Sequence, residues 1–355
     1  MKLQRIFSLF LSLVLLLCPI AGFGFETDQF NLPPEPLADI GSEVSDYIEA
    51  NLREAVASVN GDIEKTLACL ENPGKDKRCG SRESEQVRLA QLRSDEAIID
   101  EVYKRLGEGN IFRSKFGKWV NSHDFESTPS RYKTGYVDSI YVALPANYWT
   151  ISPTIDLYGV QFGTDKLEHF FQQGYRYHNI ERDAAAKEDE PARAIERAVK
   201  WGQRSERTYY GLWVSGVYSN ADLYANYAGM KFYDGLTHSI DIGGNTRPAI
   251  VLLNHGEWSI NEEISLPESL LKPFITEHLN EALNPSGYAF TIFSSVKQIV
   301  RKNACPEWKK QYPELTADAL NQKATELELW NDEDYGNMEK GRFVKLSEVC
   351  FNERS

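Results

Sequence analysis

The sequence lacks the features that would assign it to several large classes of protein. After its first 24 residues it has no apolar run of the roughly 20 residues that a membrane-spanning helix needs. It contains no P-loop, no dinucleotide-binding glycine motif and no HExxH sequence, so no organic cofactor is indicated. It also has no internal repeat and no low-complexity tract. We therefore expect a folded chain without a transmembrane segment once its N-terminal signal is removed.

Positive charge is scarce relative to negative charge. The 39 Lys and Arg residues face 52 Asp and Glu residues, which gives a net charge of -13. Residues 1–24 hold two cations, Lys2 and Arg5, and no acid, so their removal changes the charge from -13 to -15. Such a surface repels phosphate backbones and anionic headgroups. The composition thus argues against nucleic acid as a partner and against electrostatic docking on a membrane.

The N-terminal residues have the organisation of a secretory signal peptide. Lys2 and Arg5 precede an apolar run at residues 7–17, and small residues stand at Gly22 and Gly24. This pattern predicts cleavage after Gly24 and a periplasmic or secreted protein. Cys18 follows leucines, but Pro19 is a poor neighbour for a lipidated cysteine, so lipoprotein anchoring is not favoured.

Four cysteines remain after the signal, and none has the CxxC spacing of a zinc or redox site. An even number in an exported chain predicts two disulfides. Three pairings are open. We favour Cys69 with Cys79, because the segment CLENPGKDKRC is a short, turn-rich loop between helical patterns, and this leaves Cys305 to pair with Cys350.

The hydrophobic periodicity predicts a mainly α fold with a few short β segments. Residues 25–130 form a predicted N-terminal helical region with a disulfide-clipped loop, and residues 131–355 a helical core module (160–236) with a C-terminal helical extension. Helices are predicted at residues 40–59, 81–106, 164–180, 190–208, 219–236, 267–284, 289–303 and 315–330. Residues 25–35 are predicted to be an extended leader, and the patterns at 136–145 and 249–253 indicate strands.

The stretch DKLEHF opens one helix of the core module with an acid, a lysine and a histidine. Asp165 is a candidate N-cap, with Glu168 three positions later completing a capping box. Asp165 and His169 are four residues apart and share one edge of the helix. An acid bonded to a histidine orients a general base or a metal ligand, and equally well fixes a half-buried imidazole.

A second stretch, SNADLYANYAG, opens another helix of the module. Ser219 is its predicted N-cap, and Asp222 and Asn226 lie one turn apart. Small residues at Ala221, Ala225, Ala228 and Gly229 provide a surface that the first helix can approach closely. We expect the two helices to cross there and to bring Asp165, His169, Asp222 and Asn226 into one polar patch.

Two explanations of such a patch stay open. A divalent metal would accept His169 with the carboxylates of Asp165 and Asp222, while Asn226 adds a carbonyl oxygen. Alternatively, the four residues satisfy one another and fix the helix register, and a single histidine favours this structural explanation. Glu206, at the end of the intervening helix, is a candidate base, although such a residue is more often exposed. Ser215 lacks the glycines of a hydrolase nucleophile.

These two stretches resemble the D-K-x-x-H and S-x-x-D-x-x-x-N-x-x-G signature of the YfiM-type family of bacterial envelope lipoproteins. The likeness covers residues 160–236, and residues 25–150 have no counterpart in the short lipoproteins. The resemblance implies that the characteristic positions of the family are Asp165, Lys166, His169, Ser219, Asp222, Asn226 and Gly229. The candidate binding residues among them are Lys166, Ser219, Asp222 and Asn226. It brings no established activity with it.

The sequence thus predicts an exported envelope protein of a gram-negative-type bacterium, with an envelope component as its partner. The first hypothesis is a structural or binding protein of the periplasm. The alternative is a hydrolase, metal-assisted or not, that acts on an envelope lipid or glycan. In that case His169 would serve as base or metal ligand, Asp165 and Glu206 as helpers, and Asp222 and Asn226 would hold a metal or water.

Overall fold

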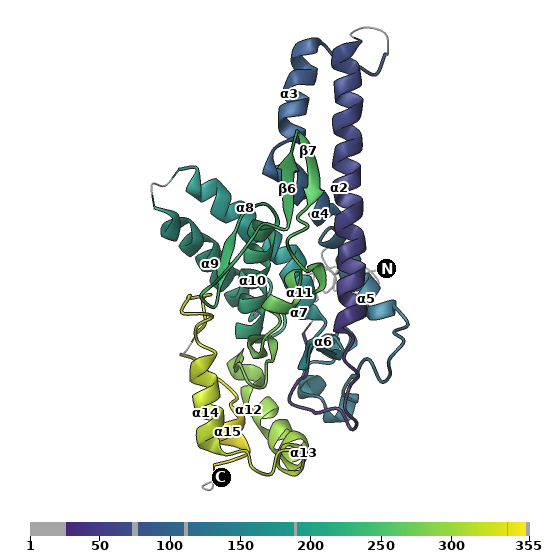
Figure 1. The fold of residues 1–355 in the computed structure, drawn as a ribbon. Coiled ribbons are helices and arrows are strands. Elements are labelled where there is room, and N and C mark those ends of the chain that lie inside the picture. Colours follow the sequence, from purple (N-terminus) through teal and green to yellow (C-terminus); the bar gives the residue numbers. More distant parts are fainter. Residues whose placement is uncertain (1–25, 73–76, 110–112, 188–189, 339, 353–355) are drawn as a thin grey trace, which may run out of the picture.

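The computed structural model describes residues 26–72, 77–109, 113–187, 190–338 and 340–352. The predicted signal peptide lies outside the described residues. The mainly α prediction is confirmed, because within the described ranges the strands form only two-stranded antiparallel sheets between many helices (Figure 1). None of the helices described is both long and apolar enough to cross a membrane.

The predicted N-terminal helical region is present, and its first helix is longer than expected. Helix α2 (Gly41–Glu71) stands along one side of the molecule, beside α3 (Arg82–Leu92) and α4 (Asp95–Leu106) (Figure 1). The apolar stripe of α2 is buried along most of its length, at Val44, Ile48, Leu52, Val59 and Ile63. Such periodic burial on one face is what holds an amphipathic helix in place.

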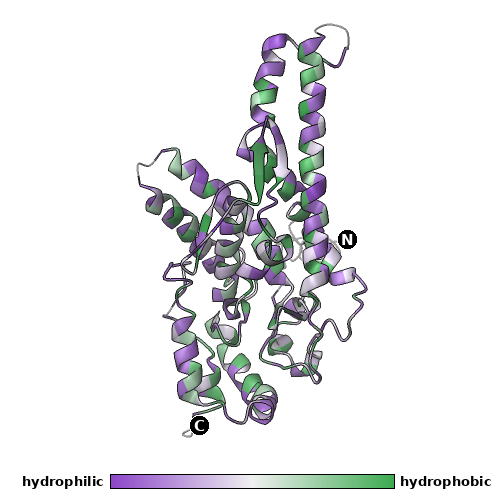
Figure 2. Ribbon diagram, viewed as in Figure 1, coloured by the Kyte–Doolittle hydropathy of each residue, from purple (hydrophilic) through white to green (hydrophobic). Residues whose placement is uncertain are grey.

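A tertiary contact divides the single helix predicted at 81–106 into α3 and α4. The indole nitrogen of Trp258 donates a hydrogen bond to the Leu92 carbonyl (3.0 Å), and the Arg93 side chain donates to the Gly256 carbonyl (2.9 Å). The Leu92 carbonyl thus bonds to a side chain at the point where the helix ends. Trp258 and Gly256 belong to the hairpin of β6 (Val251–Asn254) and β7 (Glu257–Ile260). Strand β6, which is strongly hydrophobic in Figure 2, confirms the strand predicted at 249–253.

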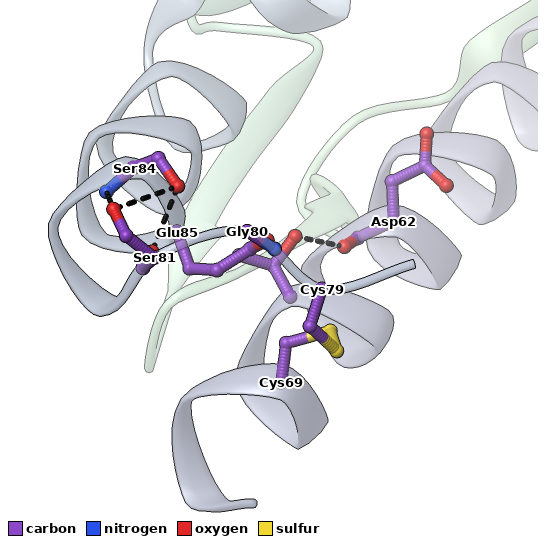
Figure 3. The surroundings of a disulfide bond; sticks show 8 residues. Asp62, Cys69, Cys79, Gly80, Ser81, Ser84 and Glu85 are labelled. Carbon is purple, nitrogen blue, oxygen red and sulfur yellow. Dashed lines mark hydrogen bonds between the residues drawn. A yellow bond between two sulfur atoms is a disulfide. The ribbon is translucent and has the colours of Figure 1, made fainter. Parts of the chain in front are cut away.

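Both favoured disulfides are present. Cys69 near the end of α2 bonds to Cys79, which lies two residues before the N-cap of α3, Ser81 (Figure 3). The Glu85 carboxylate accepts a hydrogen bond from the Gly80 amide (2.6 Å) beside it. In the C-terminal region Cys305 bonds to Cys350.

The strand predicted at 136–145 is wrong. The chain there forms two 3₁₀ turns, η1 (Tyr136–Asp138) and η2 (Ile140–Ala143). Side chains occupy the backbone groups that a strand would pair, since Ser139 caps the Tyr141 amide (3.2 Å) and Asp28 accepts from the Ile140 amide (3.0 Å).

The helix predicted at 267–284 is also wrong. The segment contains only α11 (Leu266–Ser269) and the 3₁₀ turns η4 (Lys272–Phe274) and η5 (Glu277–Leu279). Pro273 lacks an amide hydrogen and its ring excludes a continuous helix. This irregular segment later supplies a residue of the candidate site.

The central module contains the three predicted helices. The first runs without interruption through α7 (Asp165–Glu168), the π-turn η3 (His169–Gln173) and α8 (Gly174–Ala185); α9 (Pro191–Arg207) and α10 (Asn220–Thr237) follow. Gly174 and Gly229 meet where α8 crosses α10: a Cβ atom on Gly174 would lie 2.5 Å from the Gly229 Cα. The predicted small-residue crossing is therefore confirmed.

The residues that follow the predicted cleavage position are buried. Residues 26–31 cross the core without regular structure, and Trp308 donates from its indole nitrogen to the Phe30 carbonyl (2.8 Å). The predicted leader thus connects the N-terminal and C-terminal regions.

The remaining elements are α5 (Lys115–Ser122), α6 (Pro145–Trp149), β1 (Thr154–Leu157), β2 (Val160–Gly163), β3 (Val217–Tyr218), β4 (Ile240–Ile242), β5 (Asn245–Arg247), β8 (Gly287–Tyr288), α12 (Phe290–Ile299), η6 (Val300–Ala304), α13 (Cys305–Gln311), α14 (Ala317–Glu326) and α15 (Leu346–Val349).

Candidate functional site

A buried lysine lies at the centre of the polar patch. The side chain of Lys166 has no solvent-exposed surface, and its ammonium contacts Asp165 Oδ2 (2.6 Å), Asp222 Oδ1 (2.6 Å) and Glu281 Oε1 (2.5 Å). Burial alone would lower the pKa of Lys166, but the surrounding carboxylates outweigh it and raise that pKa well above 10.5. Lys166 therefore remains a cation inside the protein.

Three separate segments supply the acids around Lys166. Asp165 lies on α7 with the lysine, Asp222 lies in the first turn of α10, and Glu281 follows η5. Ser219 joins two of these segments: its hydroxyl accepts from the Asp222 amide (3.1 Å), as the predicted N-cap, and donates to Glu281 Oε1 (2.9 Å). The cap of α10 thereby holds Glu281 against Lys166.

Two further acids complete what we call the Lys166 cluster, which consists of Glu26, Asp165, Lys166, Glu206, Asp222 and Glu281. Glu26 and Glu206 are each 1% exposed. Burial, followed by the charge of Asp222, raises the pKa of both carboxyls well above 4.5. Burial also raises the pKa of Asp165 to about 6, against the opposing effect of Lys166.

Acidic groups outnumber the cation in the Lys166 cluster. Five carboxyl groups share one ammonium, and each is at most 2% exposed. Buried oxygens of Glu26 (Oε2), Asp165 (Oδ1) and Glu206 (Oε1) have no hydrogen-bond partner. Since buried carboxylates are costly without a partner, the cluster must take up protons or a further cation.

His169 connects the Lys166 cluster to the protein surface. Its side chain is 15% exposed; Nε2 lies 3.2 Å from Asp222 Oδ2 and Nδ1 lies 3.0 Å from Asn226 Oδ1. An amide oxygen can only accept, so in this orientation Nδ1 carries a proton and donates it to Asn226. Both ring nitrogens thus face groups of the protein.

The structure brings together the four residues expected to converge, with two corrections. Asp165 is not the N-cap of its helix: Thr164 holds that position, without a capping bond from its side chain, and the Asp165 carboxylate turns to Lys166. The predicted pairing of Asp165 with His169 is also replaced, since His169 contacts Asp222 and Asn226.

Glu168 has a different partner from the capping box that the sequence indicated. Its carboxylate accepts from the Ser114 amide (2.7 Å), at the start of α5. Burial raises the pKa of Glu168 to about 7. Glu168 therefore joins the core module to the N-terminal region and does not face the Lys166 cluster.

Glu26 and Glu281 were missed by sequence reasoning. Glu26 lies in an apparent leader, and Glu281 lies in a segment that was predicted to be helical. The one available signal was Lys166 itself, because a lysine beside apolar helix positions requires several carboxylates as neighbours. No spacing rule identifies those carboxylates over such sequence separations.

Two sets of side chains within the described residues have the spacing of a metal site. The ligand atoms of Asp165, Asp222 and Glu281 lie within 4.8 Å of one another, and so do those of His169, Glu206 and Asp222. The Lys166 ammonium already contacts all members of the first set. The expected metal ligands are thereby divided: Asp165 belongs to the first set, His169 to the second, and Asp222 to both.

Comparison of the chain with protein-family models, with curated proteins and with solved structures finds no match.

Proposed function

We propose that this chain is an exported envelope protein with a structural or binding role, in which the Lys166 cluster fixes how the flanking regions close on the core module. The observation that carries the proposal is the contact of the buried Lys166 ammonium with carboxylates from three segments. Glu281 extends this connection, since its amide donates to the side-chain oxygen of Gln29 (2.6 Å). The network thus spans the N-terminal segment, the module and the C-terminal region.

Export is supported by the pattern of the first 24 residues and by two disulfides, which persist mainly in oxidising compartments. The resemblance of DKLEHF and SNADLYANYAG to the YfiM-type envelope proteins points to the same compartment. The gram-negative periplasm is the location proposed here.

The surroundings of His169 favour a structural or binding role over hydrolysis. A general base needs a nitrogen within hydrogen-bond reach of its substrate. Here Nε2 faces Asp222 and Nδ1 faces Asn226, while the acids of the Lys166 cluster are at most 2% exposed. In a hydrolase acting on an envelope lipid or glycan, the imidazole of His169 would have to be freed from both partners. The one observation that supports this alternative is the 15% exposure of the His169 side chain.

The proposal is tested by location and by stability. We expect cell fractionation to find the chain in the periplasm, with Phe25 as its first residue by N-terminal sequencing. Lys166→Met should lower the free energy of unfolding by roughly 3–5 kcal/mol, because it leaves buried carboxylates without their cation. Lys200→Met is the matched control: Lys200 pairs with Glu196 (2.6 Å) at the surface, so its loss should cost no more than about 1 kcal/mol.

Two results would contradict the proposal. One is a cytoplasmic chain that retains residues 1–24. The other is a Lys166→Met protein as stable as the Lys200→Met control, which would show that the cluster does not hold the regions together.

A further inference from the structure

We infer that His169, Glu206 and Asp222 form a binding site for one divalent transition-metal ion, with zinc as the best match. The three side chains come from η3, the last turn of α9 and the first turn of α10. Their ligand atoms lie within 4.8 Å of one another. This site shares Asp222 with the contacts of Lys166, and it goes beyond the structural role proposed above.

The carboxylate of Glu206 provides the first line of evidence. The residue is 1% exposed, and its Oε1 has no hydrogen-bond partner. Its Oε2 accepts one long hydrogen bond, from the Ser219 amide at 3.4 Å. A buried carboxylate with most of its acceptor capacity unused indicates a missing ion or proton. Because an oxygen of Glu206 lies within 4.8 Å of the His169 and Asp222 ligand atoms, the missing cation would be shared with them.

The orientation of His169 is the second line of evidence. Nδ1 donates to Asn226 Oδ1, and Nε2 faces Asp222 Oδ2 at 3.2 Å. In a neutral imidazole with this orientation, Nε2 and the carboxylate oxygen would repel each other unless a metal cation or a further proton lay between them. Metal-binding histidines commonly donate their other ring N–H to an oxygen acceptor, which fixes the ring, and Asn226 is placed to do this.

The spacing suits zinc. Tetrahedral zinc with bonds of about 2.0–2.1 Å holds its ligand atoms about 3.3 Å apart. The distance from His169 Nε2 to Asp222 Oδ2 is already 3.2 Å, so a shift of the Glu206 carboxylate would complete a set of three protein ligands. One imidazole nitrogen with two carboxylate oxygens is a donor set that zinc accepts, and water would fill the fourth position.

The two oxygens of Asp222 separate the two cations. Oδ1 contacts the Lys166 ammonium (2.6 Å), while Oδ2 faces His169. Lys166 already contacts the carboxylates of Asp165 and Glu281, so the ion is directed to the side of Asp222 where Glu206 Oε1 has no hydrogen-bond partner. A dication there would also reduce the excess of negative charge in the Lys166 cluster.

The test is a zinc titration of the full mature chain after treatment with EDTA, with a chromophoric chelator as competitor and metal analysis of the dialysed protein. We expect one zinc ion per chain, and at least tenfold weaker binding for Glu206→Gln and for His169→Gln. Glu168→Gln is the matched control: it removes a partly buried acid next to His169, one that accepts from the Ser114 amide, and should bind zinc like the wild type. Near-ultraviolet circular dichroism first establishes that each variant is folded.

His169→Gln keeps the test decisive if Glu206→Gln does not fold, since His169 is partly exposed and tolerates substitution better. Less than stoichiometric zinc in the wild type overturns the inference. So does a folded Glu206→Gln or His169→Gln protein that binds zinc as tightly as the Glu168→Gln control. These results do not depend on the stability test at Lys166, so either proposal can fail while the other stands.

Discussion

The ammonium of Lys166 lies 2.5 Å from Oε1 of Glu281, a residue 115 positions further along the chain. This contact connects the first turn of the core module to an irregular segment of the C-terminal region. Because both groups are buried, neither water nor a nearby surface charge can replace either partner. The position of the C-terminal region relative to the module is therefore fixed by an ion pair as well as by apolar packing.

Replacing Glu281 tests the strength of this connection. We expect Glu281→Gln to lower the free energy of unfolding by roughly 2–3 kcal/mol, because hydrogen bonds to a charged group contribute about 1.5–3 kcal/mol. Asp165 and Asp222 still pair with Lys166 in this variant, so the cost should stay below that of Lys166→Met. The measurement is urea unfolding followed by tryptophan fluorescence.

Glu277→Gln is the control for Glu281→Gln. Glu277 lies four residues earlier and pairs with Lys323 (2.9 Å) at the surface, with 48% of its side chain exposed. Its replacement should cost no more than about 1 kcal/mol. Equal effects of the two substitutions would show that the buried contact contributes nothing beyond a surface pair.

The crossing of α8 and α10 depends on the absence of side chains at Gly174 and Gly229. A Cβ atom on Gly229 would lie 2.9 Å from the Gly174 Cα and would also overlap the Phe170 carbonyl, which is backbone and cannot turn aside. We expect Gly229→Ala to destabilise the protein by roughly 1–3 kcal/mol, the usual cost of overpacking. It should also reduce zinc binding, since the same crossing places His169 beside Asp222.

Gly61→Ala is the matched control for Gly229→Ala. Gly61 lies inside α2, where an added Cβ meets no atom within 4 Å. Alanine is the better helix former by about 1 kcal/mol, so Gly61→Ala should stabilise the chain. Thermal unfolding of both variants checks the opposite signs, and a stabilised Gly229→Ala protein would mean that the helices do not need this close approach.

The sequence predicted those parts of the fold that local rules govern. The periodicity around Leu223 and Ala228 and the cap at Ser219 located α10, and the small residue at Gly229 indicated its crossing partner. The pairing of Cys69 with Cys79 also followed from local spacing, and it left Cys305 to pair with Cys350. Each of these signals lies within a few residues of the structure that it determines.

The rest could not be predicted because distant groups decide it. The helix predicted around Phe274 fails at Pro273 and is replaced by turns that carry Glu281 to Lys166. The pattern at residues 25–35 predicted an extended leader, yet Glu26 is buried against acids far along the chain. Alternation near Ile140 indicated a strand, but Asp28, 112 positions away, binds its amide. Tertiary contacts thus overrode local preference at the residues that build the site.

The two disulfides should differ in their effects on stability. The loop closed by Cys305 and Cys350 spans 45 residues, while that closed by Cys69 and Cys79 spans 10. The chain-entropy relation gives about 4 kcal/mol for the longer loop and about 2.7 kcal/mol for the shorter one. We expect the variant with serine at both 305 and 350 to unfold at a lower denaturant concentration than the variant with serine at both 69 and 79. The reverse order would contradict the loop-length argument.

Asp28 should make stability depend on pH. Burial raises the pKa of its carboxyl above 3.8, in opposition to the hydrogen bonds from Ile140 and Asn31. The folded chain therefore binds more protons than the unfolded chain between pH 3.8 and the raised pKa of Asp28. Stability from this group is fully present below pH 3.8 and is lost as the pH rises through that window, by at most about 1.4 kcal/mol per pH unit.

Asp28→Asn isolates this effect from that of the other buried acids. An asparagine oxygen can accept from Ile140 and Asn31 as Asp28 Oδ2 does, and its amide nitrogen takes the place of Oδ1, which has no hydrogen-bond partner. We expect the variant to gain stability relative to the wild type as the pH rises above 3.8, measured by urea unfolding at each pH. The other buried acids are common to both proteins and cancel in the difference. A difference between Asp28→Asn and the wild type that stays constant across this range would mean that the Asp28 carboxyl is not held in its protonated form by burial.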